Sequence, residues 1–269
     1  MSENETPPIL ARKNYAAASV FTPESLLREA RRQKAVAMEP VPETCLLDPD
    51  GDIVRELQAL GRARRHEGWV CYHTDLHVFE INGLTVGVVG CAVGSSFAVL
   101  VAEELFASGC RLLISVTSSG QLAATQAPPY FILIDRALRD EGTSYHYLPS
   151  APYSDAPANL IGALEGAFDD LGIAVLRGAT WTTDAPFRET REAIEWTREQ
   201  GLLAVEMEAA ALYAFAKARG KPVICFAHVT NQMGQIEGDF EKGAANGASD
   251  ALAVVARAAA HLGVIVNAG

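Results

Sequence analysis

The sequence predicts a single-domain α/β protein in which a central mixed β-sheet is flanked by helices. Its 269 residues are 49% apolar, which is enough for one sizeable hydrophobic core. Short, nearly unbroken apolar runs at residues 111–116 and 223–229 are typical of strands buried on both faces of a sheet. Helix-forming segments alternate with such runs, and no internal repeat or linker divides the chain.

Residues 1–44 are expected to form an N-terminal extension with one helix, ahead of an α/β domain at residues 45–269. The first 20 residues are mostly polar and include prolines, so we expect them to be extended. Thr22, Pro23 and Glu24 form a strong helix start, because a capping residue precedes a proline at the first helical position and then an acid. This helix is predicted to reach Lys34.

The other elements are bounded by local signals. Strands are predicted at residues 45–47, 78–81, 84–89, 111–116, 131–135, 175–180 and 223–229. Helices are predicted at residues 53–60, 97–107, 158–171, 207–219 and 244–261. Asn82-Gly83 is a dipeptide favoured in tight hairpin turns, and it separates two of the strands. Gly220 and Pro222 end the alanine-rich helix, since the glycine suits its C-terminal cap and the proline prevents continuation.

Composition argues against several classes of function. A net charge of −11 disfavours nucleic-acid binding, which needs a basic surface. No apolar run approaches the ~18 residues of a membrane span, and the N-terminus lacks the pattern of a signal peptide. The five cysteines form no close pair, so a reduced, cytoplasmic protein is expected. Neither the cysteines nor the six histidines have zinc-ligand spacing, and no metal or cofactor is predicted.

The most informative stretch is residues 204–232, where Glu206 and Glu208 bracket Met207 at the expected start of the alanine-rich helix. A single acid there has an ordinary explanation, because acids are favoured in the first helical turn. Two acids around a methionine are more specific. The strand that follows ends at Asn231, and ligands of open α/β sheets usually bind at the carboxyl ends of strands.

This Glu-Met-Glu pattern resembles the nucleoside phosphorylase and nucleosidase superfamily, which includes uridine phosphorylase and hexameric purine nucleoside phosphorylase. The resemblance covers about residues 45–262. It implies that Glu208 holds the ribose hydroxyls, that Met207 packs on the sugar, and that Ser118 touches the sugar or phosphate. It also implies a homo-oligomer, either a dimer or a hexamer, that binds a small nucleoside.

The same resemblance implies a site for the base. Phe187 and Arg188 match positions that stack on the base and read its edge, although an aromatic residue after a strand can equally belong to the core. Asn231 stands where purine-cleaving relatives have an aspartate, and an amide cannot protonate a leaving base. This favours 6-oxopurines or pyrimidines over adenosine. Asp184 and His228 are fallback proton donors.

The nucleophile is left open between phosphate and water. The positions that match phosphate-binding arginines of relatives are Gly51, Ser115 and Tyr72, and none is cationic. Lost charge-assisted hydrogen bonds would weaken phosphate binding. Hydrolysis is therefore favoured, with Glu206 as a candidate base for water.

A competing anion site lies in the loop of small residues at 90–96. Backbone N–H groups at a helix start can bind phosphate, which makes Gly94 and Ser95 weak candidates together with the hydroxyls of Ser118 and Ser119. Close packing of the strand against the helix explains the small residues equally well. The loop has neither a G-x-G-x-x-G pattern nor a Walker lysine, so dinucleotides and nucleoside triphosphates are disfavoured.

The predicted function is therefore cleavage of the N-glycosidic bond of a purine or pyrimidine nucleoside. Such cleavage builds positive charge on the ribose, which a carboxylate such as Glu208 stabilises, and the leaving base needs a proton or hydrogen bond. Glu208, Asn231 and Asp184 are the predicted catalytic residues. The alternative is a non-catalytic protein that binds nucleosides through a retained ribose site.

Overall fold

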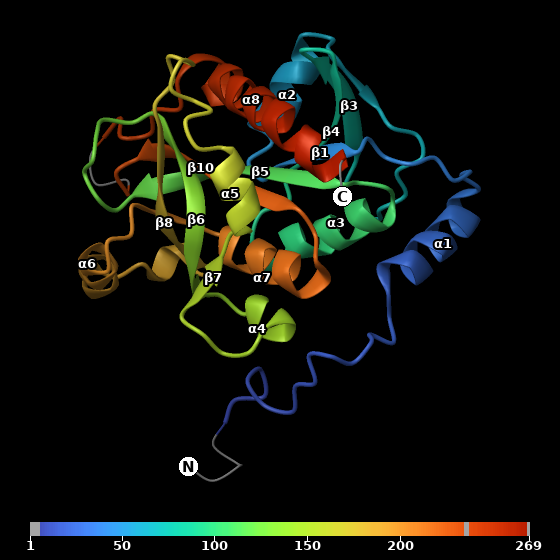
Figure 1. Cartoon of the computed structure of the whole chain (residues 1–269), viewed down its shortest axis with the longest axis horizontal. Helices are drawn as coiled ribbons and strands as arrows, with labels where there is room; N and C mark the ends of the chain where they lie inside the picture. Colours follow the sequence, from blue (N-terminus) through green and yellow to red (C-terminus); the bar gives the residue numbers. More distant parts are fainter. Residues whose placement is uncertain (1–5, 234–236, 268–269) are drawn as a thin grey trace.

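The computed structural model describes residues 6–233 and 237–267, and its strands and helices are interspersed along the chain (Figure 1). The helices are α1 (Pro23–Lys34), α2 (Asp52–Ala59), α3 (Ser95–Ala107), α4 (Ser144–Tyr147), α5 (Ala158–Ala163), α6 (Arg191–Glu199), α7 (Ala209–Arg219) and α8 (Ala248–Asn267), with short 3-10 helices η1 (Pro186–Arg188) and η2 (Ala244–Gly247). The strands are β1 (Thr44–Asp48), β2 (Ala63–Arg65), β3 (Leu76–Ile81), β4 (Leu84–Gly90), β5 (Leu112–Gln121), β6 (Tyr130–Asp140), β7 (Tyr153–Asp155), β8 (Val175–Thr183), β9 (Ala204–Glu206) and β10 (Val223–Asn231).

The strands form one mixed sheet, as predicted. Strands β5, β10, β6, β8 and β9 pair in that order and return to β5, so they form a closed ring. From β5 the sheet continues through β1, β4, β3 and β2. Strands β4, β1, β5 and β10 run parallel to one another, whereas β10 pairs with β6 in the antiparallel direction. The parallel set brings four carboxyl ends to one edge of the sheet.

Helices cover the sheet on both sides (Figure 1). In that view α8 and α2 lie above the central strands, while α3 and α7 lie below them and pack against each other. Residues 209–216 of α7 are all buried, which explains why this helix is so rich in alanine. Small side chains let it fit between α3 and the strands, so its start is held in a fixed position.

Tyr213 ties α7 to the sheet. Its hydroxyl donates to the Ile134 carbonyl at 2.6 Å and accepts from the Cys225 N–H at 3.0 Å, in a site with 1% of the residue exposed. We expect Tyr213→Phe to lower the free energy of unfolding by about 1–3 kcal/mol, because both backbone groups lose a buried partner. Denaturant unfolding measures the change. Tyr15→Phe is the matched control, since its exposed hydroxyl only donates to the Tyr145 carbonyl, and an equal loss in both variants would contradict this account.

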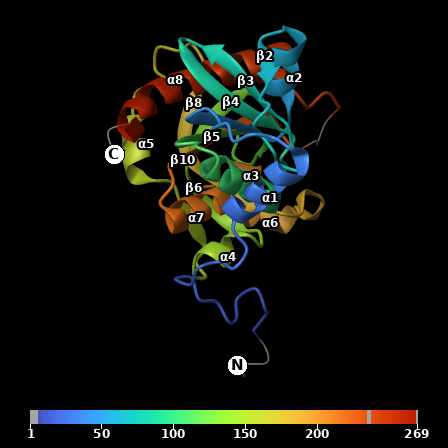
Figure 2. The same cartoon turned by 90° about the vertical axis from the view of Figure 1, so that its right-hand side faces the viewer.

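Helix α1 begins as predicted, with the Thr22 side chain accepting from the Ser25 N–H at 3.2 Å. Its buried residues Leu27 and Ala30 pack with Val70 of the α/β domain. The segment before it runs out beyond the helices, past α4 (Figure 2). The division of the chain at residues 44 and 45 stays a prediction.

No helix in the described ranges combines the length and the apolar character needed to cross a membrane.

Several element boundaries were predicted wrongly. Strands β5 and β8 were predicted to end at residues 116 and 180, but they extend to Gln121 and Thr183, because both continue along the closed ring. Helix α5 ends at Ala163 and gives way to turns, and Gly166 adopts the left-handed conformation that an α-helix excludes.

The predicted start of the alanine-rich helix was also wrong. Glu206 is the last residue of β9, and Glu208 occupies the N-cap position of α7 without a capping hydrogen bond from its side chain, so the helix begins at Ala209. Strand β9 was missed, as were β2, β7 and helix α6. The last predicted helix starts at Ala248 and not at residue 244, after the turn of η2.

Candidate functional site

The carboxyl ends of β1, β4, β5 and β10 lie at one edge of the sheet, and two of the predicted site residues, Ser118 and Asn231, lie on β5 and β10 there. The Cys91 N–H donates to the Asp48 carbonyl at 3.0 Å, which joins the loops after β1 and β4. His228 and Asn231 of β10 lie opposite Ser118 and Gly120 of β5. Asn231 was predicted to emerge at the carboxyl end of its strand, and it is the last residue of β10.

Glu208 is the central side chain of this edge. Only 1% of the residue is exposed, and its carboxylate accepts hydrogen bonds from the Gly94 N–H at 2.6 Å and the Thr117 hydroxyl at 2.7 Å. The Met207 N–H contacts the second oxygen at 3.3 Å. A carboxylate has about four acceptor positions, so one remains on the oxygen that faces Gly94. Glu208 is thus oriented by three elements, and within the described residues one acceptor position of its carboxylate is unused.

Glu206 has a different role from the one predicted. One of its oxygens accepts from the hydroxyls of Thr180 and Thr182, and the other accepts from the N–H groups of Glu208 and Ala209 at 2.7 Å each. All four acceptor positions are therefore used to hold β8 and the start of α7. A base for water needs a free acceptor, so the structure argues against Glu206 in that role.

The two glutamates influence each other. Burial raises the pKa of both carboxyls, and the nearby charge of Glu206 raises the pKa of Glu208 further, to about 7. The hydrogen bonds from Gly94 and Thr117 oppose this shift. A buried carboxylate with a raised pKa is typical of functional sites, where a cationic partner would stabilise its charged form.

The predicted anion donors are only partly available. The Gly94 N–H is used by Glu208, and the Ser95 hydroxyl donates to the Met207 carbonyl at 2.8 Å. Ser118 lines a small cavity shared with Asp48 and His228. The Ser119 hydroxyl is buried and has no partner within the described residues. Of the four candidates, the two serines of β5 have hydroxyls without a hydrogen-bond partner among the residues that the structure describes.

Asn231 is buried and already hydrogen-bonded. Its amide donates to the Thr230 hydroxyl at 3.1 Å and to the Ser119 carbonyl at 3.4 Å, and its oxygen accepts from the Met233 N–H at 2.9 Å. His228 stacks on Phe131 with ring centroids 4.4 Å apart. Burial, with a contribution from Lys242, lowers the pKa of His228 to about 4, so this ring is neutral near pH 7.

The predicted base-binding residues lie after β8. The Asp184 carboxylate accepts from the Gly142 N–H at 2.8 Å, which fixes the start of this segment. Phe187 lies in η1 and is 99% exposed, which excludes the alternative that it packs in the core. Arg188 is exposed beside it. The roles of Asp184, Phe187 and Arg188 stay predictions.

Two residues of the site were missed by sequence reasoning. Thr117, and not Ser118, contacts Glu208, because alternate residues of β5 face opposite sides of the sheet. Arg55 lies in α2 next to Gly51, and its Nη1 is 3.8 Å from the Cys91 sulfur. A Cβ on Gly51 would lie 2.7 Å from that same nitrogen, so the glycine makes room for the guanidinium. The available signal was the four-residue spacing, which places residues 51 and 55 on one helical face.

A second cation reaches the same turn. Lys242 contacts the carboxylates of Asp50 and Asp52, and Arg55 donates to Asp52 at 2.7 Å. The three positions predicted to replace phosphate-binding arginines remain uncharged. The Ser115 hydroxyl is buried without a partner in the described chain, and the Tyr72 hydroxyl donates to Gln33. Arg55 and Lys242 nevertheless place positive charge at the turn after β1.

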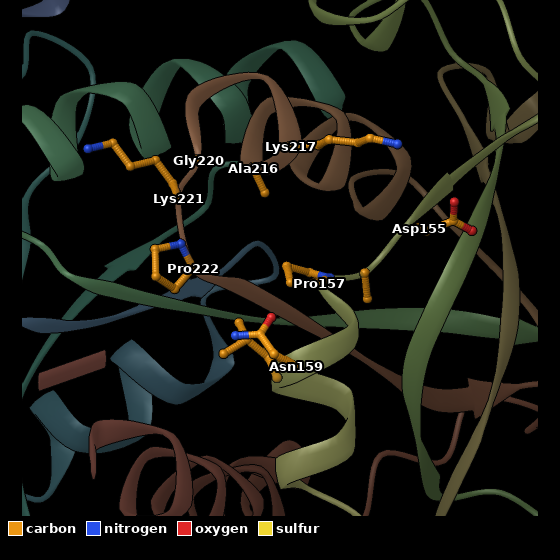
Figure 3. A pocket seen from close by; sticks show the side chains of 10 residues that line it. Asp155, Pro157, Asn159, Ala216, Lys217, Gly220, Lys221 and Pro222 are labelled. Carbon is orange, nitrogen blue, oxygen red and sulfur yellow. The ribbon is translucent and has the colours of Figure 1, made fainter. Parts of the chain in front are cut away.

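A separate cavity of about 540 Å³ opens between the start of α5 and the end of α7 (Figure 3). None of the predicted site residues lines it, and it lies at the opposite end of α7 from Glu208. In Figure 3 the side chains of Lys217 and Lys221 extend in different directions, so their charges do not converge on one point.

Within the described residues, no group of three or more potential ligands could hold a metal ion.

Comparisons with known proteins agree with this geometry. Residues 27–266 match the sequence profile of the Phosphorylase superfamily. A guanosine phosphorylase from Halorubrum lacusprofundi is 28% identical over 143 residues, which are 52% of this chain and 58% of that protein. A uridine phosphorylase from Thermococcus kodakarensis is 28% identical over 250 residues, which are 85% of this chain and 88% of that protein.

A solved structure shows the same fold. Purine nucleoside phosphorylase from Toxoplasma gondii, in complex with immucillin-H, has a TM-score of 0.71 to this chain at 18% sequence identity. The match covers 84% of this chain and 94% of that one. By contrast, the alignment spans little more than half the length of the guanosine phosphorylase. The resemblance indicated by the Glu-Met-Glu pattern is confirmed.

Proposed function

Because the chain belongs to the Phosphorylase superfamily, we propose that it cleaves the N-glycosidic bond of a nucleoside, with phosphate as the nucleophile. The observation that carries this proposal is Glu208, a buried carboxylate with one free acceptor position at the carboxyl edge of the sheet. Relatives are named for guanosine, uridine and purine nucleosides, which supports a nucleoside substrate without choosing the base.

Glu208 supplies the first requirement of the reaction. Departure of the base leaves positive charge on the ribose, and a negative charge fixed in a water-poor site stabilises that charge strongly. The free acceptor position of Glu208 binds a ribose hydroxyl, which places the carboxylate beside the sugar. The bonds from Gly94 and Thr117 keep it there without reorganisation during the reaction.

We expect the leaving base to be stabilised by hydrogen bonds and not by transfer of a proton. Asn231 cannot protonate a purine, and its amide is engaged with Ser119 and Thr230. His228 is neutral near pH 7, so it has no imidazolium proton to give to the base either. Bases that leave as stabilised anions, such as 6-oxopurines and pyrimidines, therefore suit this site better than adenine.

Phosphate is favoured over water for two reasons. Arg55 offers a cation beside Gly51 and Cys91. Glu206, the base that hydrolysis would use, has no free acceptor. Hydrolysis remains the second candidate, because Ser115 and Tyr72 provide no further positive charge.

The test is release of free base from guanosine, inosine and uridine, first in phosphate-free buffer and then with added phosphate. We expect release to depend on phosphate and to give ribose 1-phosphate. Free ribose at an unchanged rate would establish hydrolysis instead. Ligand-induced thermal stabilisation with no release in either buffer would assign the chain to the class of non-catalytic binders.

Phe187 provides a prediction about the base. We expect Phe187→Ala to weaken nucleoside binding by about 1–3 kcal/mol, the usual value for stacking of an aromatic ring on a base. Its melting temperature should change little, since the side chain is exposed. Calorimetric titration and thermal unfolding measure the two effects. Phe21→Ala, which removes a ring that is 73% exposed near α1, is the control, and equal affinity in both variants would refute the stacking role.

A further inference from the structure

The carboxylate of Glu208 does not cap α7, although Glu208 occupies the N-cap position of that helix. A side chain at this position usually accepts from the N–H of the second or third helical residue, since those groups have no partner within the helix. In α7 the second helical residue is Ala210. The Glu208 carboxylate accepts instead from the Gly94 N–H and the Thr117 hydroxyl. Other groups must therefore satisfy the start of α7.

Two side chains of neighbouring strands provide the missing acceptors. One Glu206 oxygen of β9 accepts from the N–H groups of Glu208 and Ala209. The Thr182 hydroxyl of β8 accepts from the Ala210 N–H at 2.9 Å and donates to the other Glu206 oxygen. Both Glu206 and Thr182 are buried, so water does not compete for these bonds. Three consecutive N–H groups at the start of α7 are thus held by β8 and β9.

The pairing of these two strands fixes the Thr182 hydroxyl in place. Strands β8 and β9 run parallel, with Thr182 opposite Glu206. An ordinary explanation would be that a buried threonine only satisfies its own hydroxyl, as Thr180 does by donating to Glu206 at 3.1 Å. Thr182 differs from Thr180 because its oxygen also accepts from Ala210. This one hydroxyl therefore joins the acid of β9 to the first turn of α7.

We propose that Thr182 is a positioning residue for Glu208, an inference that rests on the proposed function. Together with Glu206 it takes over the capping of α7, which leaves the Glu208 carboxylate available for the sugar. Without the hydroxyl, the N–H of the buried Ala210 would lose its partner. An N-cap side chain suits that donor, so the Glu208 carboxylate would be drawn toward α7 and away from Gly94.

A displaced Glu208 carboxylate would affect both binding and turnover of the nucleoside. In the proposed reaction it accepts from a ribose hydroxyl before the glycosidic bond breaks, and it stabilises the positive charge as the bond breaks. Phosphate is proposed to bind at Arg55, whose hydrogen bonds among the described residues go to Asp50, Asp52 and Cys91 and not to this network. The loss should therefore appear in the constants for the nucleoside and not in the KM for phosphate.

The experiment measures kcat and the KM values for nucleoside and phosphate in the full chain, Thr182→Val and Thr182→Ser, using the most rapidly cleaved of guanosine, inosine and uridine. Valine keeps the shape of threonine and removes the hydroxyl. We expect Thr182→Val to raise the KM for the nucleoside and to lower kcat/KM by about tenfold or more, because small displacements of a catalytic group are costly. Thr182→Ser, which keeps the hydroxyl, should restore most of the loss.

Thr197→Val is the matched control for loss of a buried hydroxyl. Thr197 is 1% exposed, and within the described residues its hydroxyl donates to the Ile194 carbonyl of its own helix. This variant should lower the melting temperature and keep both KM values. A purely structural role of Thr182 would give the same pattern, with fewer folded molecules and an unchanged KM for the nucleoside.

An unchanged nucleoside KM in folded Thr182→Val overturns the inference and leaves the reaction standing, as does a loss that Thr182→Ser fails to restore. If Thr182→Val does not fold, Thr180→Val replaces it, since it removes the other hydroxyl bond to the same Glu206 oxygen. The nucleoside KM should then rise by a smaller factor, and an unchanged value overturns the inference.

Calorimetric binding of guanosine in phosphate-free buffer separates this inference from the proposed function. Weaker binding by Thr182→Val that Thr182→Ser restores, without turnover by any of the proteins, supports the positioning of Glu208 and overturns the reaction. Equal binding by the full chain and Thr182→Val overturns the positioning role whether or not the nucleoside is cleaved.

Discussion

Glu208→Gln is expected to lower turnover by about 10²–10³-fold while the protein stays folded, which is the usual effect of removing one electrostatic contact to a transition state. Glutamine keeps the length of the side chain and can still accept from the Gly94 N–H and bond to Thr117. It lacks the charge that stabilises the developing cation on the ribose. Base release from guanosine, inosine and uridine measures the loss, and normal turnover on any of them would refute the assignment of Glu208.

The stability of this variant should depend on pH in a defined direction. The pKa of Glu208 is raised in the folded chain from its ordinary value of 4.5 to about 7, so between these values the folded state binds more protons than the unfolded state. Ionisation of Glu208 therefore costs stability as pH rises through this window. Compared with the unmodified chain, Glu208→Gln should gain melting temperature between pH 5 and pH 8.

Glu104→Gln provides the matched control for a buried acid. Glu104 is 2% exposed in α3, and burial raises its pKa as well, but its partners are Cys71, His73 and Lys34, far from the ribose site in the chain. That variant should change stability and leave turnover in place.

Since Glu208 acts as an anion, kcat/KM of the unmodified chain should fall as pH drops through about 7. A flat profile down to pH 5 would contradict an ionised Glu208.

Much of the fold was predictable because its signals are local. The buried apolar runs at 111–116 and 223–229 became β5 and β10, and the Asn82-Gly83 hairpin formed as expected. The capping pattern at Thr22 located the start of α1. In each case neighbouring residues alone determine the backbone, so one sequence is enough to read it.

The errors come from long-range pairing. Residues 204–206 have no local reason to be a strand, and they form β9 because β8 and β5 provide partners. The helix was therefore expected to start too early. Thr117 was missed for a related reason, since the side of β5 that faces Glu208 depends on where α7 packs. Cytoplasmic location and assembly into a homo-oligomer stay predictions.

Arg55 is expected to control the affinity for phosphate. Its Nη2 is held by Asp52 and by the Asp50 carbonyl, at 2.7 Å each, which orients the guanidinium over the turn after β1. Within the described residues its Nη1 makes one hydrogen-bond contact, with the Cys91 sulfur at 3.8 Å, so this end of the group can donate to a bound anion. Charge-assisted hydrogen bonds of this kind contribute roughly 1.5–3 kcal/mol, and the partial neutralisation by Asp52 favours the lower value.

Arg55→Gln should therefore raise the KM for phosphate by about tenfold, the equivalent of about 1.4 kcal/mol, while the KM for the nucleoside changes little. The glutamine keeps polar contact with the turn but removes the cation. Arg62→Gln, which neutralises an exposed arginine just beyond α2, is the control for the change in net charge. Rates measured against phosphate concentration at saturating nucleoside separate the two constants. An unchanged KM for phosphate in Arg55→Gln would show that the anion binds elsewhere, with the free hydroxyls of Ser118 and Ser119 as the next donors to test.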